Sequence, residues 1–146
     1  MNYLAKMKHL YSPLLFALLA LPALAEDFKN VEYVRAYDAD TITVDVKGIP
    51  AVFGDDIGIR VAGVDTPEIR GKCAAEKKLA IKARDRVRGL LESANTIDLL
   101  NVERGKYFRL VARVEIDGTD LSQLLLKEGY AVEYDGGKKT NDWCEE

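Results

Sequence analysis

Residues 60–68 read Arg-Val-Ala-Gly-Val-Asp-Thr-Pro-Glu and indicate a strand that ends in a pair of acidic residues. Small and β-branched residues fill the middle of this run, and Pro67, which has no N–H, closes it. The proline also favours an extended conformation at Thr66. Asp65 and Glu68 are therefore expected just beyond a strand end, where functional sites commonly lie. Taken alone, the stretch fits a solvated acidic turn equally well.

The segments around this run predict a β-rich domain with one main helix between residues 73 and 91, where the apolar period becomes helical. Leu79, Val87, Leu90 and Leu91 form the expected apolar stripe of that helix. A shorter helix is expected over residues 121–128, with Gly129 as its stop signal. The expected strands are residues 28–37, 41–46, 57–65, 95–102 and 107–116, with a last extended piece at 130–134.

Five short strands with a substantial helix between the third and the fourth indicate a small Greek-key barrel. We expect an α+β, β-rich fold of the five-stranded OB type, with one main helix and one or two short helices. Barrels of this type commonly bind oligonucleotides or oligosaccharides. The sequence shows no repeat and no second domain.

The first 25 residues have the pattern of a signal peptide. Lys6 and Lys8 form a basic start, residues 13–21 are apolar, and Ala23-Leu24-Ala25 is a small-x-small cleavage pattern. The apolar run is short for a membrane-spanning helix. We expect cleavage after Ala25, a single domain over residues 26–146 and secreted or periplasmic location without stable membrane association. An uncut N-terminal anchor is the alternative.

Cleavage would remove His9, the only histidine of the chain. Histidine-based catalytic triads and ordinary histidine zinc sites are then excluded, so hydrolytic chemistry would depend on carboxylates, basic side chains, tyrosines or a hard cation. Of the 21 basic residues, two would be lost, leaving 19 against 24 acidic ones. Cys73 and Cys144 would remain, and an oxidising compartment favours a disulfide between them. Two free thiols are the alternative.

Basic residues gather in two segments. Residues 70–88 hold eight basic residues and two acidic ones, and the segment 104–113 holds four basic residues. Such clusters suit polyanions. For the first segment, the solvated face of a helix is the simpler interpretation.

The acidic residues suggest a metal site. If the strands pair as expected, Asp40 and Asp65 could share a hard cation such as Ca²⁺ or Mg²⁺, whereas zinc would need softer ligands. Asp55-Asp56 is a rival pair, but Gly-Asp-Asp-Ile-Gly reads more simply as a turn. Strict alternation places Arg60 and Asp65 on opposite faces of a strand, so the two side chains can converge only if the strand curls or bulges, with Gly63 as the expected point.

Three motifs, at residues 38–41 (Asp-Ala-Asp-Thr), 60–68 and 106–109 (Lys-Tyr-Phe-Arg), make the chain resemble the staphylococcal (micrococcal) nuclease, or thermonuclease, family. The resemblance covers roughly residues 31–134, and its fold is an OB-type barrel with helices. It implies a phosphodiesterase that hydrolyses DNA and RNA with little sequence preference and leaves 3′-phosphates.

The resemblance also assigns roles to individual residues. Asp40, Asp65 and the backbone carbonyl of Thr66 match the calcium ligands, and Glu68 matches the acid that activates water. Arg60 and Arg109 match the two arginines that hold the scissile phosphate. More loosely, Lys106 and Tyr107 match positions that line the nucleotide pocket.

Two departures from the family pattern concern Ala39, where glycine is usual, and the segment before Arg109. The family often reads Asp-x-x-Gly-Arg there, whereas this chain has Gly105 in place of the acid and Phe108 in place of the glycine. The leading hypothesis is an exported, monomeric, Ca²⁺-dependent nuclease. The alternatives are a non-catalytic OB-type nucleic-acid-binding domain and a barrel that binds oligosaccharide or protein.

Overall fold

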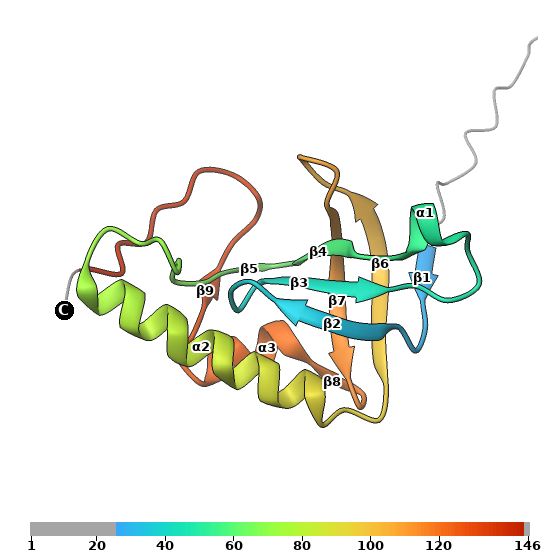
Figure 1. Ribbon diagram of the computed structural model, residues 1–146. Helices are drawn as coiled ribbons and strands as arrows, with labels where there is room; N and C mark the ends of the chain where they lie inside the picture. The colour runs from blue at the N-terminus through green and yellow to red at the C-terminus, as the bar shows by residue number, and fades with distance from the viewer. Residues whose placement is uncertain (1–25, 145–146) are drawn as a thin grey trace, which may run out of the picture.

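The computed structural model describes residues 26–144 (Figure 1). The expected signal peptide lies outside the described residues. The helices are α1 (Ala51–Gly54), α2 (Ala74–Glu92) and α3 (Leu121–Lys127). The strands are β1 (Glu26–Phe28), β2 (Glu32–Ala36), β3 (Thr41–Asp45), β4 (Ile57–Val61), β5 (Val64–Asp65), β6 (Ile97–Arg104), β7 (Leu110–Ile116), β8 (Thr119–Asp120) and β9 (Val132–Glu133). Among the described helices, none is long and apolar enough to cross a membrane.

The main sheet is strongly curved, and its strand order is β1-β6-β7-β4-β3-β2, with β8 paired to β7. Neighbouring strands are antiparallel except β4 and β7, which run parallel. The five expected strands correspond to β2, β3, β4, β6 and β7 of this sheet. The prediction of an OB-type α+β fold with one main helix and two short ones is confirmed.

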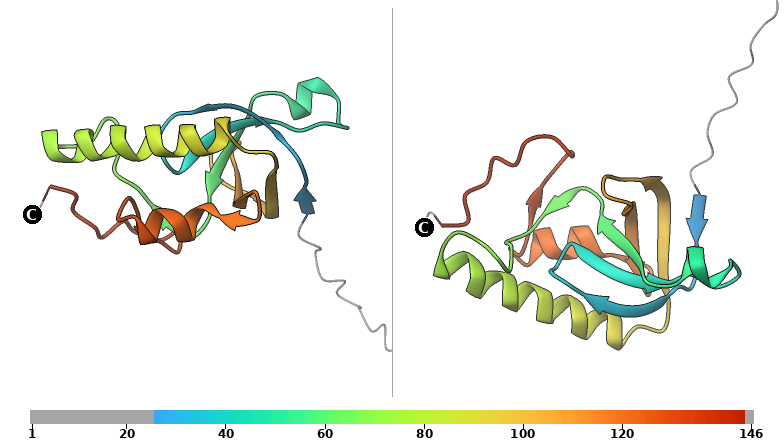
Figure 2. Two further views of the ribbon diagram at one scale, coloured as in Figure 1. Left: turned by 90° about the horizontal axis from the view of Figure 1, so that it is seen from below. Right: turned by 45° about the horizontal axis from the view of Figure 1, so that its top comes forward.

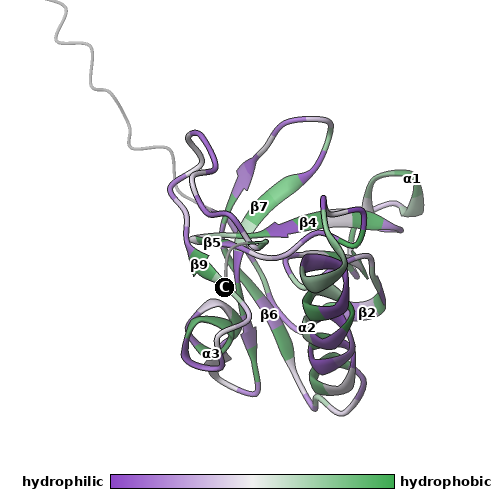
Figure 3. Cartoon of the chain, turned by 90° about the vertical axis from the view of Figure 1, so that its left-hand side faces the viewer, coloured by the Kyte–Doolittle hydropathy of each residue, from purple (hydrophilic) through white to green (hydrophobic). Residues whose placement is uncertain are grey.

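Helices α2 and α3 cover one side of the sheet, packing on β2 and β7 respectively (Figures 1 and 2). Of the expected apolar stripe on α2, Val87 and Leu91 are buried, while Leu79 and Leu90 are only half-buried. The alanines between them complete the buried face, because their small side chains let the helix approach the sheet closely. Figure 3 shows α2 foreshortened, with its many hydrophilic residues in purple.

The run 28–37 is divided into β1 and β2, and two expected strands that carry site residues are also shorter in the structure than in the prediction. The run 57–65 is divided into β4 and β5 by a turn at Ala62 and Gly63, where Gly63 has a φ of +80°. The run 107–116 becomes a strand only at Leu110, because Tyr107 and Phe108 have left-handed φ values of 58° and 60°. Their aromatic character favours a strand, but the reversal of the chain between β6 and β7 requires a turn there.

Candidate functional site

The pairing of β3 with β4 brings the first acidic turn to Arg60. Thr41, the first residue of β3, lies opposite Arg60 in this antiparallel pair. The carbonyl of Asp40 accepts a hydrogen bond from the backbone N–H of Val61 at 2.8 Å. Asp40 is therefore held at the edge of the sheet next to the arginine of the neighbouring strand.

The turn at Gly63 brings Asp65 to the same arginine. Arg60 Nη2 lies 3.3 Å from Asp65 Oδ1 and donates a hydrogen bond to the carbonyl of Val64 at 3.1 Å. Without the turn, alternation would place the two side chains on opposite faces of one strand. The expected departure from regular strand geometry at Gly63 is confirmed, because the left-handed residue separates β4 from β5.

Asp40 is the most connected carboxylate of the site. Its Oδ2 accepts hydrogen bonds from the Thr66 backbone N–H at 3.0 Å and from Thr66 Oγ1 at 2.8 Å. Its Oδ1 accepts from Thr41 Oγ1 at 3.1 Å and forms an ion pair with Arg60. Asp40, Asp65 and Thr66 are all buried, so the arginine connects two carboxylates that are shielded from water.

Asp38, to which the sequence assigned no role, belongs to the same cluster. It is buried, and its Oδ1 has no hydrogen-bond partner among the described residues. Burial raises the pKa of Asp38, against the opposing effects of a hydrogen bond from Thr41 and the charge of Arg60. A desolvated carboxylate oxygen without a partner is the kind of group that a cation would stabilise.

Glu68 lies at the open side of the site, on a loop that Glu76 holds in place. The Glu68 side chain is 54% exposed. The buried Glu76 accepts hydrogen bonds from the backbone N–H groups of Glu68, at 3.2 Å, and of Lys72, at 2.7 Å. Sequence reasoning missed this positioning residue. The sequence signal for Glu76 was its position three residues after Cys73, the N-cap of α2, because a glutamate at that position often accepts hydrogen bonds from backbone N–H groups.

Lys139, from the C-terminal tail, contacts two of the expected site residues. Its Nζ lies 2.8 Å from Asp65 Oδ1 and 2.6 Å from Glu68 Oε1. Burial lowers the pKa of Lys139, but its hydrogen bonds to the two carboxylates outweigh that effect and raise it above its usual value. The last residue of the tail that the structure describes is Cys144, whose Cα lies 6.0 Å from that of Cys73, with the two sulfur atoms in contact.

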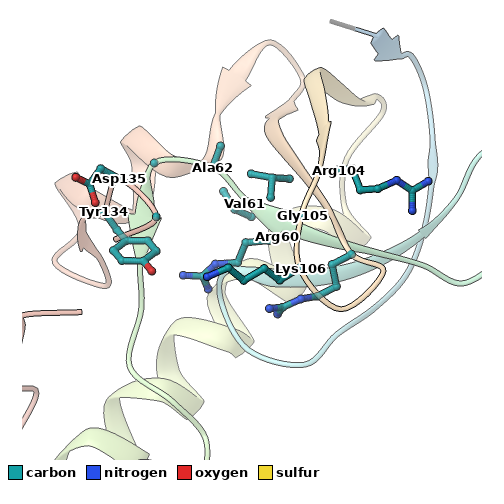
Figure 4. A pocket seen from close by; sticks show the side chains of 12 residues that line it. Arg60, Val61, Ala62, Arg104, Gly105, Lys106, Tyr134 and Asp135 are labelled. Carbon is teal, nitrogen blue, oxygen red and sulfur yellow. The ribbon is translucent and has the colours of Figure 1, made fainter. Parts of the chain in front are cut away.

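Next to the acidic cluster lies a basic pocket of about 660 Å³ (Figure 4). Arg60 and Arg109, the two expected phosphate ligands, both line it. Its other cationic and aromatic lining residues are Arg104, Lys106 and Tyr134. Figure 4 shows Arg60 and Tyr134 pointing toward one another, and the Arg60 guanidinium lies 5.8 Å from the centre of the tyrosine ring.

Tyr134 was missed by the sequence assignment, and Tyr107 lies elsewhere than expected. Tyr107 does not line the pocket and is 84% exposed at the tip of the turn between β6 and β7. Lys106, the other residue expected to contact substrate, does line it. Of the two assignments, the structure therefore places only the lysine beside the two arginines.

The basic residues of the segment 70–88 do not line the pocket. Three of its arginines interact within the chain: Arg84 pairs with Asp85, Arg86 pairs with Glu128, and Arg88 donates to the carbonyl of Ala36. These contacts favour a solvated helix face. Asp56, of the rival acidic pair, is exposed and pairs with Arg35.

The residues of the site fit a hard divalent cation. Asp40 and Asp65 offer carboxylate oxygens, and Thr66 offers a backbone carbonyl. With Asp38 and Glu68 included, four carboxylates face the two cationic side chains of Arg60 and Lys139, leaving two negative charges when all are ionised. Among the described residues, no three carboxylates of this site have oxygens that all lie within 4.8 Å of one another.

One soft cluster also occurs in the described part of the chain. Cys73, Glu76 and Cys144 bring their ligand atoms within 4.8 Å of one another. The two sulfur atoms contact each other in this arrangement, which leaves neither of them placed to bind zinc.

A comparison with protein families agrees with this geometry. The model of the family described as "Staphylococcal nuclease homologue" matches residues 58–145, more than half of the chain. The matched segment includes both pocket arginines, Asp65, Glu68 and Lys139, whereas Asp40 precedes it, so the position of Asp40 rests on the strand pairing described above. The chain belongs to the staphylococcal nuclease homologue family.

Proposed function

We propose that this protein is a Ca²⁺-dependent nuclease that hydrolyses phosphodiester bonds of DNA, RNA or both with little sequence specificity and leaves 3′-phosphates. One observation carries the proposal: Arg60 contacts both expected metal-binding carboxylates and lines the pocket that Arg109 also lines. A phosphate group in that pocket would meet two guanidinium groups, whose planar donors match phosphate oxygens in pairs.

The proposed roles follow from the chemistry of each residue. Asp40, Asp65 and the Thr66 carbonyl hold the cation, which when bound supplies charge to polarise a phosphate oxygen. Arg60 and Arg109 orient the phosphate and stabilise the negative charge that develops on it during attack.

Glu68 takes a proton from the attacking water. Its position at the open side of the site leaves room for that water, because more than half of its side-chain surface is exposed. To act as a base it must release its hydrogen bond with Lys139.

A non-catalytic OB-type domain that binds nucleic acid is the second candidate. The contact of Lys139 with Asp65 and Glu68 favours it, because this lysine occupies the carboxylate oxygens that metal binding and water activation would use. The two candidates differ in whether the protein cleaves bound nucleic acid when Ca²⁺ is present.

Export is part of the proposal. Residues 1–25 would act as a cleaved signal peptide, and the mature, monomeric protein would be secreted or periplasmic. In an oxidising compartment, Cys73 and Cys144 would form a stable disulfide that anchors the tail carrying Lys139. The proximity of the two sulfur atoms supports this part of the proposal.

In the decisive experiment, the purified protein is incubated with single-stranded DNA, once with Ca²⁺ and once with a chelator. We expect Ca²⁺-dependent products whose 3′ ends a phosphatase can dephosphorylate. Glu68→Gln should lower the rate by roughly 10² to 10⁴-fold with an unchanged circular dichroism spectrum, since it removes the base. Lys82→Ala, on the exposed face of α2, is the matched control and should keep full activity. Binding without cleavage in Ca²⁺ would favour the second candidate instead.

A further inference from the structure

The C-terminal tail runs from β9 past the acidic cluster to the start of α2 (Figures 1 and 2). Its residues 135–144 form neither helix nor strand. Its two short turns are closed by local hydrogen bonds, which Asp135 and Asp142 accept from backbone N–H groups two residues further on. Local structure therefore shapes the tail but does not attach it to the domain.

Two side chains attach the tail to the domain. Lys139 forms ion pairs with Asp65 and Glu68. Cys144 lies against the N-cap residue of α2. In the described part of the chain, every hydrogen bond and ion pair between residues 138–144 and the rest of the domain involves Lys139 or Cys144. Because the lysine side chain is 42% exposed, its ion pairs are screened by water, so the cysteine pair is the stronger attachment.

Trp143, the only tryptophan of the chain, packs against the domain only in part. Its ring is half-buried and lines a cavity of about 180 Å³ that Glu68, Glu76 and Lys139 also line. Its Nε1 is shielded from water and has no hydrogen-bond partner among the described residues. A buried donor without a partner is unfavourable, and exposure to water would satisfy it. The ring therefore does not hold the tail in place by itself, and its docking depends on the anchor at the next residue.

The anchor at Cys144 fixes the second end of a short segment that carries Lys139. The first end is fixed by β9, whose residues Val132 and Glu133 pair with β5, and Cys144 lies five residues after the lysine. A charged group on such a closed segment stays at a high effective concentration near its partners. If the bond at Cys144 is open, the segment is held at β9 alone, and the weak ion pairs must then offset its conformational freedom. The contact of Lys139 with the two carboxylates is therefore linked to the state of the two cysteines.

We propose that Cys73 and Cys144 form a redox switch that controls the affinity of the acidic cluster for Ca²⁺. With the disulfide closed, the tail holds Lys139 on Asp65 and Glu68, where its charge competes with the cation. Reduction releases the tail and leaves these carboxylates free for the cation. The inference rests on the proposed function, since it takes the cluster as a Ca²⁺ site.

The reductant of this switch is a dithiol. One of its thiolates attacks a sulfur of the disulfide, the bond between Cys73 and Cys144 breaks, and a mixed disulfide forms. The second thiol of the reductant then displaces the remaining cysteine, so that the reductant becomes a disulfide and both cysteines become thiols. Two electrons and two protons pass from the dithiol to the protein. Both cysteines are half-buried, so a small dithiol can reach them without unfolding of the domain.

The test combines calorimetric titration of Ca²⁺ with the fluorescence of Trp143, which requires no metal. We expect dithiothreitol to shift the Trp143 emission to longer wavelength, because the ring enters water, and to lower the Kd for Ca²⁺. The decrease should be several-fold and no larger than the roughly 5- to 30-fold effect of removing the charge of the lysine. Lys139→Met should bind Ca²⁺ equally in both redox states. Lys138→Met, at an exposed neighbour, keeps the competing charge and is the matched control, so it should respond to dithiothreitol as the unmodified protein does.

Cys144→Ser repeats the test without a reductant. This variant should bind Ca²⁺ as tightly as the reduced protein, show the same shift in emission, and not respond to dithiothreitol. Its circular dichroism spectrum should match that of the unmodified protein, because residues 135–144 contribute no helix or strand. If the variant fails to fold, the reduced unmodified protein still decides the question.

Several outcomes overturn the inference. Modification of both cysteines by iodoacetamide before any reductant is added would show that the disulfide is absent. An unchanged or higher Kd on reduction refutes competition by the tail, and an equal decrease in Lys139→Met shows that the effect does not pass through the lysine. If no form of the protein binds Ca²⁺, the metal assignment of the proposed function fails together with the inference. Equal Kd values in two redox forms that both bind Ca²⁺ refute the inference alone.

Discussion

Replacing Lys139 should strengthen Ca²⁺ binding. The ammonium group of Lys139 lies 2.8 Å from an oxygen of Asp65, an expected metal ligand, and 2.6 Å from an oxygen of Glu68. A cation that binds Asp65 must displace this contact or share the carboxylate with it. Lys139→Met removes the charge and retains most of the length and apolar surface of the side chain.

The magnitude follows from the exposure of the three groups. The Lys139 and Glu68 side chains are 42% and 54% exposed, so solvent screens their attraction, whereas the Asp65 side chain is only 4% exposed. Ion pairs with exposed partners contribute about 0.2–1 kcal/mol each, and the buried carboxylate places one of the two pairs at the upper end. Removing this competing interaction of about 1–2 kcal/mol should lower the Kd for Ca²⁺ by roughly 5- to 30-fold.

Isothermal titration of Ca²⁺ into the purified protein measures this effect directly, without relying on activity. Lys138→Met is the matched control, because Lys138 neighbours Lys139 on the tail, is exposed and forms no ion pair within the described residues. Equal Kd values in Lys139→Met and the unmodified protein would refute the competition. If neither protein binds Ca²⁺, the metal assignment itself is wrong.

Three further predictions concern the loop, the tail and pH. Glu76→Gln should lower the rate of cleavage, because Glu76 positions the loop that carries Glu68, and the loss of rate should not follow the change in stability. A comparison of KM and kcat on single-stranded DNA should locate the loss in kcat. Cys144→Ser should lower the free energy of unfolding by up to about 4 kcal/mol without reductant, the chain-entropy value for closing the loop to Cys73, and by far less with reductant. Hydrogen bonds from backbone N–H groups lower the pKa of Asp117, so its contribution to stability is complete above the unfolded pKa and is lost as pH falls through the folded one. Urea unfolding of Asp117→Asn should therefore show a deficit at pH 7 that disappears in acid, and a deficit independent of pH would contradict this.

The strands and main helix could be predicted because local patterns determined them. Ile42 and Val44 alternate with polar residues and are fully buried in β3, and the helical period after Cys73 gives α2. The convergence of Arg60 and Asp65 could also be predicted. Strict alternation would place the two side chains on opposite faces of a strand, so a shared site required a break in the strand, and a glycine lay between them.

The missed residues depend on contacts that local patterns indicate weakly or not at all. Lys139 meets Glu68 across 71 positions of sequence, through a tail without regular structure at that point. Glu76 looked like one more charge on a helix, yet it is buried because its carboxylate binds the preceding loop. At Tyr107, residue preference indicated a strand, while the geometry of the chain reversal determined the conformation.

At Ala39 and Phe108 the structure explains the two departures from the family pattern differently. Ala39 is fully buried and is not among the residues with positive φ, so alanine is accommodated there without backbone strain. Phe108 adopts the left-handed conformation that glycine adopts freely. The first substitution is therefore conformationally mild, and the second is not.

The parallel pairing of β4 with β7 links the site to the order of folding events. Arg60 lies opposite Val111, two residues after Arg109, so the spacing of the two arginines is set by a contact between distant parts of the chain. Contacts with large sequence separation form late, because a long loop must close first. In a refolding experiment the helical signal of α2 should therefore recover before activity does. A chain in which β4 has not yet paired with β7 would contain both arginines, but it would not hold them at the spacing that forms the phosphate site.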